Sequence, residues 1–350
     1  MLPPDWLDSP LRRMKHEVMI DDVQRLIDTQ AKGAEAKRNS VQSENYNLTI
    51  YHRHKEIEDW IRSMAAEYPD IASIHNIGTS LFGRPMNVIK ISKPNGRRKP
   101  IVWMDSGIHA REWISPATNQ YFIHQLLTKY AEDSQVQNFV DQIEWHILPV
   151  VNPDGYEYSH THNRMWRKSR SGPIDGCYGV DPNRNYDFKW MEIGASSSSC
   201  MENFAGPTPE SEIETRNLRD YVLPLAKDMK AFITIHSYSQ LFLTPWGHTT
   251  ELPSDNDDVH GLGVKATNAL TAVHGTEYEV GSDANILYMT SGTSRDWAKG
   301  VAKVKYTYTV ELRDTGEYGF LLPEEQIEPT SEETWEAIKV IASQIISEFA

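Results

Sequence analysis

The chain has 350 residues, of which 39% are hydrophobic and 24% are charged, and its formal net charge at pH 7 is −14. This composition is typical of a globular protein with room for one large domain or two smaller ones, and no apolar run is long enough to cross a bilayer. The acidic charge disfavours nucleic acid as a partner, because phosphate binding needs a basic face.

Residues 1 to about 44 differ in pattern from the rest of the chain. Val23, Leu26 and Ile27 give this segment an apolar face with helical spacing. A polar stretch follows and ends in the basic pair Lys37-Arg38. It is either a solvated helix and linker or a cleavable connector, because exposed basic sites are where trypsin-like proteases cut.

From about Tyr46 onward, short apolar runs alternate with amphipathic stretches. Candidate strands cover residues 86–91, 101–104, 143–150, 231–235 and 304–312. Helices are expected around residues 57–64, 117–130, 209–221, 261–273 and 331–349, the last with Thr330 and Glu333 as a capping box. The alternation predicts an α/β fold, with a mixed, mainly parallel twisted sheet and helices on both faces.

Polar side chains follow three of these candidate strands. His109 and Glu112 come after the run at 101–104, His236 ends the run at 231–235, and Glu311 lies near the end of the last run. Ligands in such sheets bind outside the carboxyl ends of the strands, so these residues can share one rim. Histidine and glutamate are ordinary zinc ligands. By itself, however, the His109–Glu112 spacing is also that of a surface pair on a helix.

Three protein ligands leave a fourth zinc position for water, which is the catalytic pattern. The second glutamate, Glu311, can then act as general base toward that water. Taken alone, His236 fits a hydrogen-bonded histidine of the core better than a metal ligand, and it is the combination of positions that favours a metal site.

Only two cysteines occur, Cys177 and Cys200, in a segment rich in glycine and serine. Two interpretations stay open from these residues alone. A disulfide would indicate an oxidising compartment, and two buried thiols would not.

From about residue 46 to the C-terminus, the chain resembles the A/B-type zinc metallocarboxypeptidases of the digestive kind. The blocks that carry the resemblance are 109–112, 163–167, 183–185, 236–239 and 311–316. The resemblance implies an activation segment and connector over 1–38 and a catalytic domain over 39–350. It implies a secreted zymogen, active as a monomer, that a trypsin-like protease releases near Lys37 or Arg38. A bridge between Cys177 and Cys200 also matches the family.

The resemblance further implies a role for each residue of the site. His109, Glu112 and His236 would bind one zinc ion, Glu311 would activate water, and Arg167 would stabilise the oxyanion. The substrate is then the C-terminus of a peptide or protein, whose carboxylate Asn183 and Arg184 would hold. The residues expected to contact substrate are Arg111, Asn183, Arg184, Ser237, Tyr238, Asp283, Tyr288 and Arg295.

The stretch from Tyr288 to Trp297 matches the family's side-chain pocket without gaps and places Arg295 at its base. Arginine there resembles the carboxypeptidase O branch, which removes C-terminal Glu or Asp, so an acidic preference is expected. Asp283 also matches a pocket position. If Asp283 pairs with Arg295, the pocket is neutralised and a broad or apolar preference follows instead.

Two other classes of function compete with a secreted exopeptidase. A non-enzymatic binding protein on the same fold typically lacks a zinc ligand or the base, whereas this chain has all of them. A cytosolic enzyme that trims acidic residues would fit an acidic pocket, but the expected disulfide and activation segment disfavour it.

Overall fold

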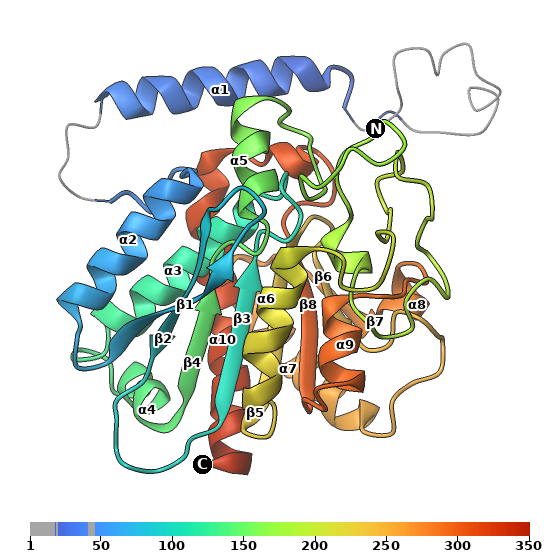
Figure 1. Cartoon of the computed structure of the whole chain (residues 1–350). Coiled ribbons are helices and arrows are strands. Elements are labelled where there is room, and N and C mark those ends of the chain that lie inside the picture. The colour runs from blue at the N-terminus through green and yellow to red at the C-terminus, as the bar shows by residue number, and fades with distance from the viewer. Residues whose placement is uncertain (1–17, 19, 41–45) are drawn as a thin grey trace.

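The computed structural model of the chain describes residues 18, 20–40 and 46–350, with the backbone alone for 33–40. The described residues form one eight-stranded sheet in the order β1-β2-β4-β3-β5-β8-β6-β7 (Figure 1). The strands are β1 (Ala72–Thr79), β2 (Pro85–Ile91), β3 (Ile101–Ser106), β4 (Glu144–Leu148), β5 (Met229–Ser237), β6 (Leu241–Thr244), β7 (Glu279–Ser282) and β8 (Tyr306–Leu312). The four central strands β4, β3, β5 and β8 are parallel, as is the edge pair β6–β7, whereas β1–β2, β2–β4 and β6–β8 are antiparallel. The predicted mixed sheet with a parallel centre is therefore confirmed.

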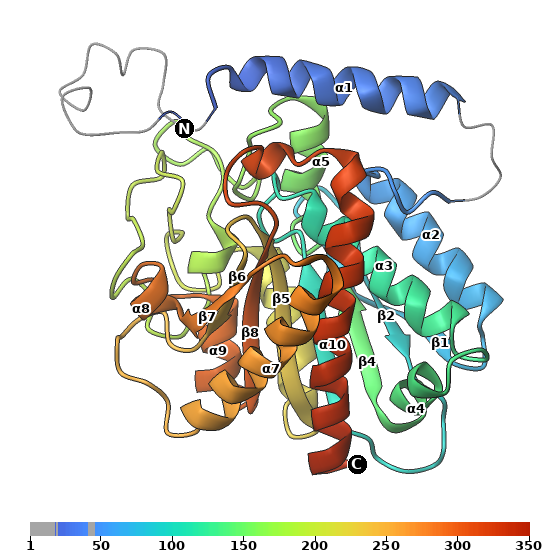
Figure 2. The same cartoon turned by 180° about the vertical axis from the view of Figure 1, so that it is seen from behind.

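Helices cover both faces of the sheet, as the two opposite views show (Figures 1 and 2). The helices are α1 (Val23–Ser40), α2 (His54–Glu67), α3 (Ile114–Thr128), α4 (Ser134–Gln142), α5 (Pro153–Thr161), α6 (Ile213–Val222), α7 (Asn256–His274), α8 (Asp283–Ile286), α9 (Ser294–Gly300) and α10 (Ile327–Phe349). One apolar core joins the sheet to α2, α3, α4, α7 and α10, and a second joins it to α6 and α9.

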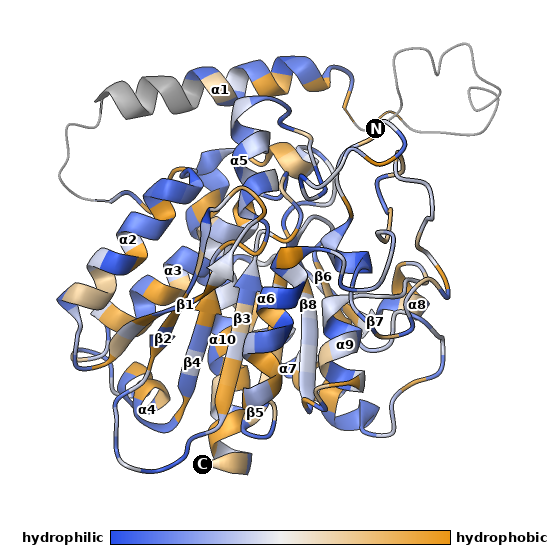
Figure 3. Ribbon diagram, in the orientation of Figure 1, coloured by the Kyte–Doolittle hydropathy of each residue, from blue (hydrophilic) through white to orange (hydrophobic). Residues whose placement is uncertain are grey.

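The central strands are buried on both faces, which explains why they read as continuous apolar runs rather than as alternating ones. Every residue of β3 is buried, and Figure 3 shows hydrophobic residues along the first part of this strand. Burial of this kind fixes the strands rigidly, so the residues at their carboxyl ends have a defined position.

The structure departs from the sequence expectations at the short and polar elements. Strands β1, β6 and β7 were not expected, because β1 is largely polar and the other two have four residues each. The predicted capping box is wrong: α10 begins at Ile327, and Thr330 Oγ1 donates to the carbonyl of Gln326 inside the helix. Glu333 binds Arg313 instead.

The N-terminal segment forms α1, which lies across the end of the molecule where the carboxyl ends of the central strands meet (Figures 1 and 2). Gln30 links it to the rest of the chain, because Arg164 Nε donates to Gln30 Oε1 at 2.7 Å. The basic pair at 37–38 lies toward the end of α1. Residues 1–17 and 41–45 lie outside the described residues, so the division into 1–38 and 39–350 stays a prediction. Among the helices that are described, none has the length and apolarity that a membrane crossing requires.

Candidate active site

Three neighbouring strands bring the predicted metal ligands and base to one end of the sheet. His109 and Glu112 lie in the turn between β3 and α3. His236 lies in β5, directly beside Glu311 in the parallel register of β5 with β8. Because β3, β5 and β8 are consecutive in the sheet, residues far apart in sequence meet at one point, as expected from the rule for strand ends.

His109, Glu112 and His236 form a buried cluster whose ligand atoms lie within 4.8 Å of one another. The Nδ1 atom of His109 lies 2.7 Å from Glu112 Oε1. The Nδ1 atom of His236 lies 3.1 Å from Glu112 Oε2 and 3.1 Å from His109 Nδ1. Two imidazoles and one carboxylate thus converge on a single small volume.

The hydrogen bonds around this cluster fit a metal ion. His109 Nε2 lies 3.2 Å from the carboxylate of Asp181, so this nitrogen carries the ring proton. Nδ1 is then an acceptor, yet it faces the Glu112 carboxylate, which is an acceptor too. Such a group of lone pairs is stable when a cation lies among them, and nitrogen and carboxylate oxygen are zinc ligands.

Glu112 is ionised at this position. Burial opposes its ionisation, but the adjacent His109 and His236 lower the pKa of the carboxyl well below its usual value. The cluster therefore offers the negative charge that a divalent cation needs.

Arg167 and Asp181 form a buried ion pair beside the cluster. The Nη2 atom of Arg167 donates to Asp181 Oδ2 at 2.9 Å, and Nε donates to the same oxygen at 3.2 Å. Asp181 thus holds His109 with one oxygen and Arg167 with the other. This geometry fixes the guanidinium 4.0 Å from Glu112 Oε1.

A cavity of about 230 Å³ opens on this cluster. The predicted residues that line it are His109, Arg111, Glu112, Arg167, Asn183, Arg184, Ser237, Tyr238, Asp283, Tyr288, Arg295 and Glu311. His236 lies behind them, buried in β5. Glu311 is half-buried in the cavity wall. Desolvation raises the pKa of its carboxyl against the opposing effect of His236, and Glu112 raises it further.

Arg111, Asn183 and Arg184 are among the residues that line the cavity. Arg184 is held in place because its Nη1 donates to the carbonyl of Asn183 at 2.8 Å. The Asn183 side chain accepts from the backbone N–H of Ser294 at 2.9 Å, which ties this wall to α9. Arg111 stacks on Phe320, with 4.2 Å from its guanidinium carbon to the ring centroid. Tyr288 is 55% exposed and lies at the mouth.

Arg295 and Asp283 also line the cavity, and they are paired. Arg295 Nη2 donates to Asp283 Oδ2 at 2.9 Å and to Asp296 Oδ1 at 3.0 Å. Burial acts to lower the pKa of the guanidinium, but Asp283 and Asp296 raise it above its usual value, so Arg295 is charged. The sequence predicted a neutralised pocket if Asp283 pairs with Arg295, and the two residues do pair.

The chain also matches a known protein family. The family model described as "Zinc carboxypeptidase" matches residues 57–337. The chain belongs to the zinc carboxypeptidase family. It is a metallocarboxypeptidase, a peptide hydrolase whose cofactor is zinc.

Curated relatives and solved structures agree with this assignment. The enzyme is 50% identical over 297 residues to carboxypeptidase B of Astacus astacus, covering 84% of this chain and 97% of that one. It is 44% identical over 303 residues to human carboxypeptidase O, covering 86% and 81%. The crystal structure of thrombin activatable fibrinolysis inhibitor matches with a TM-score of 0.90 and 37% identity, over 99% of this chain and 86% of that chain. A carboxypeptidase A from Helicoverpa armigera matches with a TM-score of 0.89 and 30% identity, over 98% and 85%.

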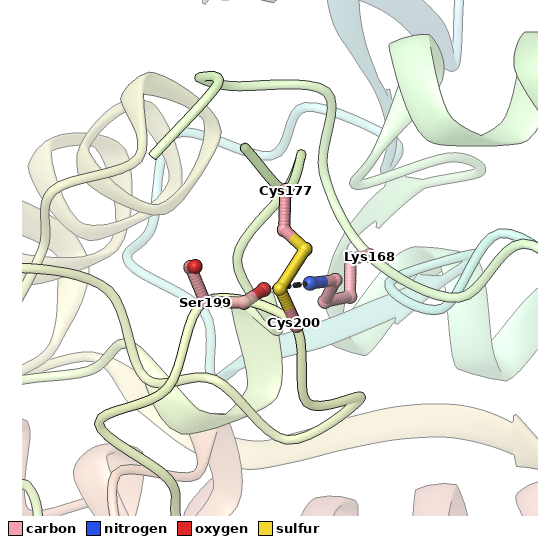
Figure 4. Close-up of a disulfide and its surroundings, with 4 residues drawn as sticks. All are labelled: Lys168, Cys177, Ser199 and Cys200. Atoms are coloured by element: carbon pink, nitrogen blue, oxygen red, sulfur yellow. Dashed lines mark hydrogen bonds between the residues drawn. A yellow bond between two sulfur atoms is a disulfide. The ribbon is translucent and has the colours of Figure 1, made fainter. Parts of the chain in front are cut away.

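Cys177 and Cys200 form a disulfide, as expected from the resemblance, with their sulfurs 1.93 Å apart (Figure 4). Beside it, Lys168 Nζ donates to the carbonyl of Ser199 at 2.6 Å. The bridge closes a long loop. This loop contacts the cavity lining, since Arg184 Nε donates to the carbonyl of Gly194 in the loop at 3.2 Å.

Sequence reasoning missed two carboxylates of the enzyme. Asp181 orients His109 and Arg167, and Asp296 holds Arg295 from behind. Each stands next to a residue or motif already singled out, two positions before Asn183 and one after Arg295. An arginine assigned to a buried site requires an acidic partner, and that requirement was the available signal.

Proposed function

We propose that the enzyme removes the C-terminal residue of peptides, with Glu311 as general base and Arg167 as the group that stabilises the oxyanion. The observation that carries this proposal is the shared cavity. Glu311, Arg167 and two of the three metal ligands all line it. A base, a cation and a metal site around one small volume provide what amide hydrolysis requires.

Zinc, when bound by His109, Glu112 and His236, supplies Lewis acidity and makes a water nucleophilic near neutral pH. Glu311 takes the proton of the attacking water. It then gives that proton to the leaving amine, which needs protonation before it can depart. A carboxyl whose pKa is raised is suited to both transfers, because it holds and releases a proton closer to neutral pH.

Arg167 stabilises the negative charge that develops on the scissile carbonyl oxygen. Its pairing with Asp181 holds the guanidinium in position before substrate arrives, so little reorganisation accompanies the reaction. Asn183 and Arg184 bind the terminal carboxylate, for which a guanidinium is a well-shaped partner. Arg111 and Tyr288 contact the substrate from the rim of the cavity.

The side-chain preference follows from the state of Arg295. An acidic preference, as predicted from sequence, needs a guanidinium free to bind the substrate carboxylate. Asp283 lies on that guanidinium and would repel a second carboxylate. We therefore favour neutral C-terminal side chains over Glu and Asp.

We also propose that the enzyme is secreted. A disulfide is characteristic of proteins that fold in an oxidising compartment. Release near Lys37 and Arg38 by a trypsin-like protease and action as a monomer remain parts of the same proposal. Digestion with trypsin, followed by N-terminal sequencing of the catalytic product, tests the release point.

Glu311→Gln tests the catalytic assignment, because the amide keeps the size of the side chain and cannot accept the proton. We expect kcat to fall at least ~100-fold, the usual worth of a general base, while zinc content stays at one ion per chain. The matched control is Glu317→Gln, a carboxylate on the exposed loop after β8. Near-normal turnover of Glu311→Gln, or activity that survives complete removal of zinc by a chelator, would refute the mechanism. An unmutated enzyme that binds C-terminal peptides without hydrolysis would indicate a binding protein instead.

A further inference from the structure

Asp283, which lines the cavity, carries a carboxylate oxygen with an unmet hydrogen bond. Asp283 is 6% exposed and lines the cavity. Its Oδ2 accepts from Arg295 Nη2 at 2.9 Å and from Thr290 Oγ1 at 3.1 Å. Its Oδ1 is buried and has no hydrogen-bond partner among the described residues. A buried acceptor without a donor is costly, and a ligand that supplies one gains the difference.

Arg295, which also lines the cavity, carries donors that the described residues leave unused. The hydrogen bonds of the Arg295 guanidinium to described residues go through Nε and Nη2. Nη1 therefore has N–H groups for an acceptor in the cavity that Arg295 lines. The cavity thus meets both an acceptor, Asp283 Oδ1, and a donor, Arg295 Nη1, although Arg295 also pairs with a second carboxylate, Asp296.

Asp296 is a second carboxylate on the same guanidinium, and it lies away from the cavity. It lies behind Arg295, and its Oδ2 accepts from the backbone N–H of Gly247 at 2.8 Å and pairs with His248 Nδ1 at 3.1 Å. Its Oδ1 accepts from Arg295. Asp296 is fully buried and does not line the cavity, so substrate meets Asp283 and Arg295.

We propose that Asp283 and Arg295 together read a carboxamide, so that the enzyme prefers peptides ending in glutamine or asparagine. The amide oxygen accepts from Arg295 Nη1, and the amide N–H donates to Asp283 Oδ1. This inference rests on the proposed carboxypeptidase function and names its substrate class. A carboxylate side chain of the substrate would accept from the Arg295 guanidinium, but its negative charge would lie beside that of Asp283. An ammonium satisfies Asp283 but faces Arg295, and an apolar side chain leaves both groups unpaired.

The test compares blocked peptides that differ only in the last residue, which is Gln, Glu, Met or Lys. Gln and Glu differ by one atom type, and Met has a similar length without the polar end. We expect kcat/KM for Gln to exceed the other three by at least ~10-fold, the usual worth of hydrogen bonds to charged groups.

Two variants then move the preference in opposite directions. Asp283→Asn removes the carboxylate that lines the cavity and leaves Arg295, still held by Asp296, to meet the substrate, so the Glu-to-Gln ratio of kcat/KM should rise by at least ~10-fold. Arg295→Met leaves the carboxylate of Asp283 facing the cavity, so the Lys-to-Gln ratio should rise by a similar factor. Glu279→Gln, which removes an exposed carboxylate from β7, is the matched control and should leave all ratios unchanged.

The outcomes separate this inference from the function on which it rests. If no peptide is hydrolysed, the carboxypeptidase function itself fails. If all are hydrolysed and Glu, Met or Lys is cleaved as fast as Gln, the carboxamide preference is wrong while the function stands. The comparison on unmutated enzyme decides this point even if a variant does not fold.

Discussion

Replacing Glu58 by glutamine should remove a pH-dependent weakness in the fold. Glu58 lies on α2, is 6% exposed and accepts a hydrogen bond from Asn87 Nδ2. Burial raises the pKa of its carboxyl to about 7, against the opposing effect of Asn87. Its neighbour His54 lies 3.6 Å away, and burial lowers the pKa of that imidazole to about 4. Around pH 6 this contact therefore joins two largely neutral groups rather than an ion pair.

The sign and size of the effect follow from linkage. In the window between the unfolded pKa of about 4.5 and the folded pKa of about 7, the folded state binds more protons than the unfolded state. Stability is thus highest below this window and falls as pH rises through it. Between about pH 5 and about pH 8 the loss from this one group is ~2.5 kcal/mol. Glutamine resembles the protonated acid and has no such loss.

Urea unfolding, followed by the fluorescence of the 10 tryptophans, measures the difference. The free energy of unfolding of Glu58→Gln minus that of the unmutated enzyme should grow by ~2.5 kcal/mol from about pH 5 to about pH 8. Zinc affinity changes with pH equally in both proteins and cancels in this difference. Glu67→Gln, at the exposed end of the same helix, is the control. A difference that is constant with pH, or that shrinks, would show that Glu58 is ionised in the folded enzyme.

Three further changes test other features of the structure. Replacing Cys177 and Cys200 together by serine should lower the free energy of unfolding by ~3 kcal/mol, since the bridge spans a sequence separation of 23. Urea unfolding of the reduced, unmutated enzyme should show the same loss. Gly292→Ala should raise KM on the order of 10-fold, because at φ +70° its Cβ would lie 2.4 Å from the carbonyl of Arg184; Gly261→Ala, whose Cβ meets nothing within 4 Å, should leave KM unchanged. Arg313→Met should lower the free energy of unfolding in urea by ~3–5 kcal/mol, because it leaves the fully buried Glu333 without its cation. A loss below ~1 kcal/mol would contradict the importance of this ion pair for stability.

The sequence alone predicted the fold class and the candidate residues of the metal site. The central strands are buried on both faces, so each leaves a continuous apolar run, and the polar residues just after such runs are easy to find. His109, Glu112, His236 and Glu311 were identified in this way, together with the family resemblance. The short strands β6 and β7 and the polar strand β1 left no comparable pattern, because their place in the sheet depends on neighbours distant in sequence.

Only the tertiary structure decided how Arg295 is paired. The sequence placed Arg295 and Asp283 in one pocket but gave no distance between their side chains, and an acidic or a neutral preference followed from opposite answers. In the structure the helix α8, which begins at Asp283, and the helix α9, which carries Arg295, bring the two charges to 2.9 Å. Asp181 was missed for the same reason, since its two partners lie in other segments. A motif specifies which groups are present, whereas the pairing of charges depends on distances that only the packed elements set.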